Sequence, residues 1–252
     1  MKTRSVLIKP LGKLSLILAA LMSISGSAFA DDTDTNIMQL MKLNPGATKT
    51  EILTQAKLLA STFNLSISEV VSKQLLEAQS SAANASNAIN TGDLDTNVYR
   101  SSGNKEVKLV NADRRGDIFY SPASTLFIEH GHSGIYSATD VIVEAPGIGK
   151  TSRHINPRSL TVSSGTQIQY VTVSQERRNA AATYAYLKMR DKPYNALFSD
   201  NKYVPAVRYN CSQLVWGAYK ATSNVDLDSN GGFGVYPADI RDSSVTVTYR
   251  TL

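Results

Sequence analysis

The only cysteine of the 252-residue chain, Cys211, is the strongest candidate for a nucleophile. A single cysteine cannot form an intramolecular disulfide, so it is a small buried side chain, an intermolecular link or a reactive thiol. Leu214, Val215, Ala218 and Tyr219 follow it at helical spacing, which places Cys211 in the first turn of an amphipathic helix. Helix starts stabilise anionic thiolates. Burial statistics alone would predict a cysteine packed in the core. The position at the start of a helix favours a reactive thiol instead.

A thiol nucleophile needs a base, and the chain has three histidines: His130, His132 and His154. His132 lies at the start of a predicted strand, and its small neighbours leave room for a substrate or a partner side chain. His130 points to the same face if the strand includes it and diverges if a turn intervenes. His154 lies in a polar segment and is expected at the surface. His132 is thus the predicted base, and a histidine that only makes structural hydrogen bonds is the alternative.

Glu144 is the candidate for the group that orients this base. It ends the apolar run 141–143, where a buried carboxylate would need a partner. If the strands of His132 and Glu144 are antiparallel neighbours, the carboxylate can reach the imidazole and fix its tautomer. The alternatives are an unpaired Glu144 at a wet strand end and Asp140, in the turn, as the orienting acid.

Other chemistries fit the sequence less well. The histidines and the cysteine lack zinc-ligand spacing. Segment 147–151 resembles the end of a phosphate loop without its first glycine. Segment 226–232 resembles the start of a calcium loop, but Pro237 stands where the closing acid belongs, which favours a solvated turn. We therefore expect neither a metal nor a cofactor.

Residues 1–30 have the pattern of a secretory signal peptide. A basic start is followed by an apolar core at 16–22 and by Ala28-Phe29-Ala30, so we expect cleavage after Ala30 and a secreted or periplasmic protein. The apolar run is too short to span a bilayer, which argues against stable membrane insertion. Four of the five net positive charges come from this segment, so residues 31–252 carry a formal charge of +1. The basic pI therefore gives no reason to expect a nucleic-acid partner.

Residues 31–97 are predicted to form a helical segment that ends in a linker. Thr48 and Glu51 form a capping box, and Ser68 could cap a second helix. The Ser-, Ala- and Asn-rich run 80–90 indicates a linker or a frayed helix end. The segment could pack on the main domain, cover the active site as a pro-region or target the cell wall.

Residues 98–252 are predicted to form the main domain, of α+β class, with an antiparallel sheet packed against helices. Strands are expected near 107–110, 118–120, 131–136, 141–145, 166–173 and 243–251. Helices are expected at 175–190 and from Cys211 onward.

Four short segments carry the candidate site residues and their neighbours, in the order 115–120 (RGDIFY), 132–136 (HSGIY), 143–145 (VEA) and 209–216 (YNCSQLVW). In this order they resemble the circularly permuted papain-like cysteine hydrolases, the YiiX/YycO-like branch of the NlpC cell-wall hydrolase superfamily. The resemblance covers about residues 113–242. It implies a permuted papain-like fold with Cys211 as nucleophile, His132 as base and Glu144 as orienting acid. Tyr209 matches an aromatic residue that binds substrate or the oxyanion.

The resemblance implies a secreted cysteine hydrolase that cleaves amide bonds in the peptide stems of peptidoglycan. A second hypothesis keeps the thiol chemistry but changes the substrate to a lipid or a host protein, as in an acyltransferase, an esterase or a toxin. A third is a cell-wall-binding module on the same fold that does not catalyse.

Overall fold

The computed structural model describes residues 33–90, 105–122 and 130–252, and the side chains of all these residues except 86–90. The predicted signal peptide and the expected domain boundary at residue 98 lie outside the described residues. Residues 33–252 belong to one unit, which combines helices with antiparallel sheets and is of the α+β class expected from the sequence.

Among the described residues, three helices precede the first strand. They are α1 (Thr33–Leu43), α2 (Lys49–Phe63) and α3 (Ile67–Asn90). The capping box expected at the start of α2 is present, because the Thr48 side chain accepts the N–H of Glu51 and the Glu51 side chain accepts the N–H of Thr48. Asn64 ends α2 in the left-handed conformation.

The start of α3 differs from the expected one. Ser66, not Ser68, forms the capping box, with the Glu69 carboxylate accepting the N–H of Ser66 at 2.7 Å. The helix also continues through residues 80–90, where the sequence indicated a linker or a frayed end. Alanine is the best helix former, and Ala78 and Ala85 are buried on one face, which explains why this composition stays helical.

The main sheet has six strands in the order β5-β4-β3-β2-β7-β8, and every neighbouring pair is antiparallel. Its strands are β2 (Ile118–Ser121), β3 (His132–Ala138), β4 (Val141–Glu144), β5 (Arg153–Ile155), β7 (Gln167–Val171) and β8 (Thr246–Thr251). A separate pair consists of β1 (Glu106–Lys108) and β6 (Thr161–Ser163). The expected strands are present, and β5 and β6 are two short ones that the sequence did not reveal.

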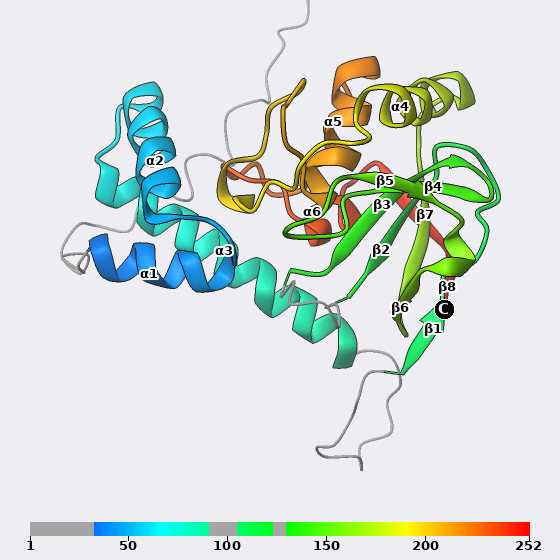
Figure 1. Cartoon of the computed structure of the whole chain (residues 1–252), viewed down its shortest axis with the longest axis horizontal. Helices are drawn as coiled ribbons and strands as arrows, with labels where there is room; N and C mark the ends of the chain where they lie inside the picture. The colour runs from blue at the N-terminus through cyan, green and yellow to red at the C-terminus, as the bar shows by residue number, and fades with distance from the viewer. Residues whose placement is uncertain (1–32, 91–104, 123–129) are drawn as a thin grey trace, which may run out of the picture. The chain divides into compact units, whose positions relative to one another are not determined.

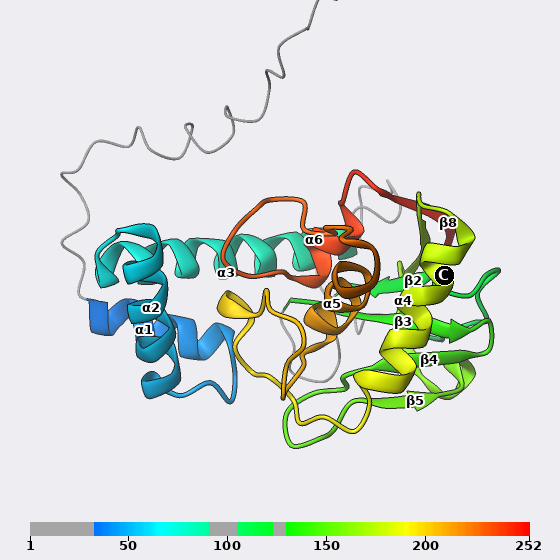
Figure 2. The ribbon, with the colours of Figure 1, turned by 90° about the horizontal axis from the view of Figure 1, so that it is seen from above.

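Two further helices cover one face of this sheet (Figures 1 and 2), namely α4 (Gln175–Lys188) and α5 (Cys211–Ser223). Ile118, Ile135 and Val143 of the sheet share an apolar cluster with residues of both helices. On the opposite face, Phe119 and Tyr136 belong to a second cluster with residues of β1 and β6. The short helix α6 (Pro237–Arg241) follows a loop after α5. In the described helices, none has the length and apolar character to cross a membrane.

Candidate active site

Cys211 is the first residue of α5, as the sequence predicts. The helix starts there because Asn210 is its N-cap and accepts the N–H of Gln213 through its side-chain oxygen at 2.9 Å. The cysteine is free and its exposed fraction is 0%. The sulfur therefore lies buried at the N-terminus of a helix, where backbone N–H groups have no partner within the helix.

His132 and Glu144 lie on neighbouring antiparallel strands. Glu144 of β4 stands opposite Gly134 of β3, and His132 is two residues from Gly134 and so projects from the same side of the strand. His132 Nε2 lies 2.6 Å from Glu144 Oε2. Gly134 contributes no side chain between them, so the carboxylate reaches diagonally to the imidazole.

Gly134 also allows a close approach from the next strand. A Cβ atom at this position would lie 2.5 Å from the ring of Phe119, its partner on β2. The Phe119 ring packs edge-on against His132, with 5.5 Å between ring centroids. The glycine thus lets an aromatic ring support the imidazole.

Arg153 holds the second oxygen of Glu144. It stands opposite Glu144 on β5, and its Nε donates to Glu144 Oε1 at 2.8 Å. Burial raises the pKa of Glu144, but the contacts with His132 and Arg153 outweigh burial and leave this pKa lower than usual. The carboxylate is therefore ionised at neutral pH and can stabilise a positive charge on His132.

The second nitrogen of His132, Nδ1, is the one left for the cysteine. It makes no hydrogen bond of ordinary geometry within the described chain. Burial lowers the pKa of His132, but the Cys211 sulfur and the Glu144 carboxylate outweigh burial and raise this pKa to about 10. The sulfur is thus a close electrostatic neighbour of the imidazole. In unliganded catalytic sites such pairs are often long or poorly aligned and tighten only when substrate binds.

The other two histidines lie elsewhere. The strand starts only after Gly131, whose φ of 82° turns the chain, so His130 diverges from His132 and contacts the carbonyl of Leu43 at 2.7 Å. Burial lowers the pKa of His130 to about 4, which keeps it neutral. His154 contacts Arg190 at the surface, at 2.9 Å.

Asp140 and Tyr209 also have defined places. Asp140 is exposed in the turn between β3 and β4. Tyr209 is buried in the cluster beneath α5, and its hydroxyl accepts the N–H of Ala206 at 2.8 Å. The structure gives Tyr209 a packing role, and its role in substrate binding stays a prediction.

Tyr194 is a further residue near the sulfur. The backbone segment of Tyr194 pairs with that of Tyr209, two residues before Cys211. Burial, together with the nearby Cys211, raises the pKa of Tyr194 well above its usual value. Its buried hydroxyl has no hydrogen-bond partner in the described part of the chain, so it is a free donor close to the site. No sequence pattern assigned a role to Tyr194.

Arg153 contacts Glu144 although the sequence gave it no role, and the acidic residues of the segment that resembles a calcium loop have partners within the protein. Arg153 was missed because the strand that carries it has only three residues. In the loop, Asp228 binds the ammonium group of Lys202 at 2.6 Å, and Asp226 accepts the indole N–H of Trp216 at 2.8 Å. In the described residues, no set of three or more histidine, cysteine or acidic side chains is arranged to hold a metal ion.

The fold and this site define an α+β protein with a buried cysteine–histidine–glutamate cluster. No family model matches the chain. The chain is 31% identical over 246 residues to the uncharacterized protein YycO of Bacillus subtilis strain 168, which covers 95% of this chain and 98% of that protein. The chain therefore belongs to the YycO family.

A solved structure gives a weaker likeness. It is described as that of the metalloprotein yiiX from Escherichia coli O157:H7. The match covers 55% of this chain and 97% of the other, with a TM-score of 0.36 and 12% identity. That likeness is too weak to carry chemistry from one protein to the other.

Proposed function

We propose that the protein is an exported cysteine hydrolase that cleaves amide bonds, with the peptide stems of peptidoglycan as its substrate. The observation that carries the proposal is the position of His132, which contacts Glu144 at 2.6 Å and has the Cys211 sulfur as its other close neighbour. A cysteine, a base and a group that orients the base are the three parts of an activated nucleophile.

In the proposed reaction the Cys211 thiolate attacks the carbonyl carbon of the amide, while His132 holds the proton. The C–N bond breaks, the amine leaves with the proton from His132, and a thioester remains on the sulfur. Water then attacks the thioester carbon and gives a proton to His132, and the C–S bond breaks so that Cys211 leaves as the thiolate. The carboxylic acid is released, and Glu144 stabilises the imidazolium in both steps.

The tetrahedral intermediate needs hydrogen-bond donors for its oxyanion. The N–H of Cys211, at the helix start, is one candidate, and the unpaired hydroxyl of Tyr194 is a second. A donor of this kind contributes typically about 3 kcal/mol to catalysis.

An ester or amide of a fatty acid is the second candidate substrate. The apolar cluster that contains Cys211 also contains Leu197, Phe198 and Tyr236, so the surroundings of the sulfur suit an acyl chain.

Mass spectrometry of the reaction products distinguishes the two candidate substrate classes. Residues 31–252 are incubated with purified peptidoglycan and, in parallel, with phospholipid and N-acyl amide substrates, and the products are weighed. Stem fragments whose summed mass exceeds that of the intact stem by one water for each cleaved peptide bond support the wall hydrolase. Release of fatty acid without stem cleavage supports the lipid substrate, and no product from any substrate contradicts both.

A further inference from the structure

The sulfur of Cys211 is closed off from solvent, with an exposed fraction of 0%. Its apolar cluster extends into the first three helices, which we call the helical module (residues 33–85). Module residues of this cluster include Ile37, Leu40, Ile52 and Val71. A polymeric substrate cannot reach a sulfur in this state, so catalysis of the proposed kind requires part of the chain to move.

The helical module binds the loop that precedes α5. The side-chain oxygen of Asn44 accepts the N–H of Phe198 at 3.0 Å, and the amide of Gln74 donates to the carbonyl of Ser199 at 3.1 Å. Both amide side chains are fully buried. These contacts hold Phe198, a member of the cluster around Cys211, in place.

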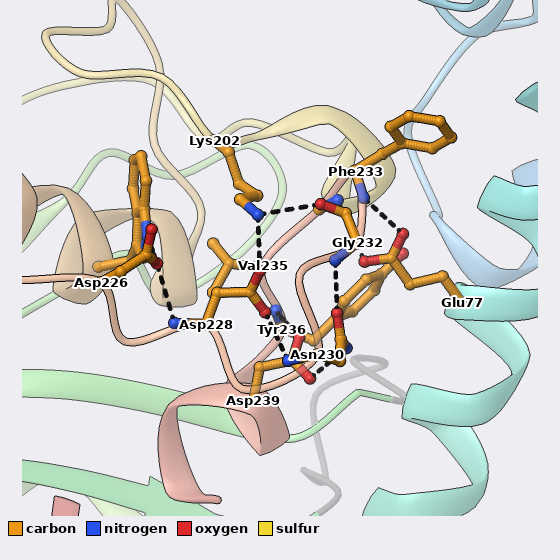
Figure 3. Close-up of polar contacts among 12 residues, drawn as sticks. Glu77, Lys202, Asp226, Asp228, Asn230, Gly232, Phe233, Val235, Tyr236 and Asp239 are labelled. Atoms are coloured by element: carbon orange, nitrogen blue, oxygen red, sulfur yellow. Dashed lines mark hydrogen bonds and ion pairs between the residues drawn. The ribbon is translucent and has the colours of Figure 1, made fainter. Parts of the chain in front are cut away.

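The module also binds the loop that follows α5. Figure 3 shows Glu77 reaching from α3 to the backbone of this loop, where its two carboxylate oxygens accept the N–H groups of Phe233 at 3.0 Å and Gly234 at 3.1 Å. Gly232 makes the close approach possible, since a Cβ atom there would lie 2.2 Å from Glu77 Oε1. Glu77 therefore acts as a latch between the module and the loop.

The two loops are joined to each other across the start of α5. Lys202 of the first loop donates to the carbonyl of Gly232 at 2.9 Å and to Asp228 at 2.6 Å (Figure 3). Asn201 accepts the N–H of Val235 at 2.7 Å and donates to its carbonyl at 2.8 Å. Breaking the hydrogen bonds of Glu77 would therefore loosen both loops beside Cys211.

A third contact lies beside the base. His130, two residues before His132, binds the carbonyl of Leu43 at the end of α1 at 2.7 Å. The module therefore contacts the chain next to the nucleophile on both sides and next to the base.

The module consists of three consecutive helices that pack on one another through buried apolar residues, which include Ile37, Ile52 and Val70. The same apolar cluster continues into the loops beside Cys211. The module's polar contacts with the loops are formed by side chains with backbone groups, and water can replace such partners when the contacts open. Burial and the nearby Asp239 disfavour the ionised form of Glu77 and raise its pKa to about 8, while the hydrogen bonds from the loop N–H groups favour the ionised form.

We propose that the helical module is an inhibitory cover, latched by Glu77 to the loop after α5, and that its release exposes Cys211 to substrate. An inhibitory role rests on the proposed hydrolase function. The contacts between the module and the loops are structural observations that do not depend on an activity.

The test uses the single cysteine as its own probe. Residues 31–252 are treated with iodoacetamide at pH 7, and alkylation of Cys211 is followed by intact-protein mass spectrometry. Glu77→Ala removes the acceptor of two loop N–H groups, and Gly232→Ala places a methyl group against Glu77 and forces the loop away while position 77 stays a glutamate. Glu69→Gln is the matched control, since Glu69 lies on the same helix and glutamine also serves in a capping box.

The proposal predicts that both latch variants are alkylated about 10-fold faster than the wild type, and that Glu69→Gln is not. Hydrogen exchange at Phe233 and Gly234 should accelerate in the same two variants. Unchanged alkylation in variants whose loop amides do exchange faster would show that the latch opens without uncovering the sulfur, and would overturn the proposal.

Unfolding of the variants and failure of the proposed hydrolase function can each be told apart from failure of the cover. If both variants lose the folded state by circular dichroism, exchange in the wild type decides: faster exchange in the helical module than in β2 and β3 supports a cover, and equal exchange contradicts it. Full turnover by Cys211→Ala would contradict the proposed hydrolase but would leave the alkylation result unchanged.

Discussion

Glu144 Oε2 lies 2.6 Å from His132 Nε2, and Arg153 binds the other oxygen of the same carboxylate. Each hydrogen-bonding side of Glu144 thus has a fixed partner, although the side chain is almost fully buried. A buried carboxylate that is held from both sides can fix the tautomer and the orientation of an imidazole. The three residues come from the neighbouring strands β3, β4 and β5.

Glu144→Gln keeps the size of the side chain and removes its charge. The pKa of His132 should then fall from about 10, because Glu144 is one of the two groups that raise it against burial. NMR titration of the imidazole signals measures this pKa, with exposed His154 as the internal reference. Turnover should fall by about 100-fold, which is typical of losing general acid–base assistance. An unchanged pKa of His132 would contradict the assigned contact.

His132→Gln and His154→Gln separate the base from a surface histidine. The first variant removes the proton acceptor and should abolish turnover on the substrate identified by mass spectrometry. The second should retain wild-type turnover, since the His154 side chain contacts a surface arginine and a tyrosine ring. Equal turnover in the two variants would remove His132 from the mechanism.

Gly134→Ala tests the packing that supports His132. The added Cβ would lie 2.5 Å from the Phe119 ring, so the ring must move away from the imidazole. Overpacking of this kind costs about 1–3 kcal/mol of unfolding free energy. Thermal unfolding should therefore show a Tm lower by about 2–12 °C.

The neighbouring variant Ser133→Ala is the control for this experiment. The buried Ser133 hydroxyl has no hydrogen-bond partner within the described residues, so its removal should leave Tm and turnover close to wild type. A Gly134→Ala protein as stable and as active as this control would contradict the close packing of Phe119.

The pH dependence of stability should report on Glu77. Its pKa is about 8 in the folded protein against a usual 4.5, because it is buried and lies near Asp239 and Asp228. The folded state therefore binds more protons than the unfolded state between these values, and stability falls as pH rises from about 4.5 through 8. Lys202, bound to Asp228, is the nearby positive charge.

Thermal unfolding at pH 5.5 and pH 8.5 measures this effect. The wild type should lose more Tm between the two pH values than Glu77→Gln, in which position 77 cannot ionise. Glu69→Gln should behave as the wild type. A Glu77→Gln protein with the full pH dependence of the wild type would place the titration elsewhere.

Local patterns predicted much of the fold and the neighbouring positions of the main residues of the candidate site. The capping box at Thr48 and the helix that begins at Cys211 depend on neighbours within a few residues, and both are present. The pairing of the strands that carry His132 and Glu144 follows from a short turn between them. Such features are encoded locally and can be read without knowing the rest of the fold.

The remaining features depend on contacts between distant residues. Arg153 reaches Glu144 only through β5, a strand too short to show periodicity. Tyr194 is brought near Cys211 by pairing with the segment of Tyr209, and Glu77 meets a loop 156 residues further along the chain. No local pattern could place these residues at the site.

The central claim is that Cys211 is a nucleophile, and turnover by Cys211→Ala tests it most directly. Residues 31–252 with and without this substitution are incubated with the substrate on which the wild type acts, and product is quantified by mass spectrometry at equal protein concentration. Cys211→Ala should lose all product formation and keep the fold, since alanine replaces a fully buried small side chain. Product formation by Cys211→Ala at the wild-type rate would contradict the central claim.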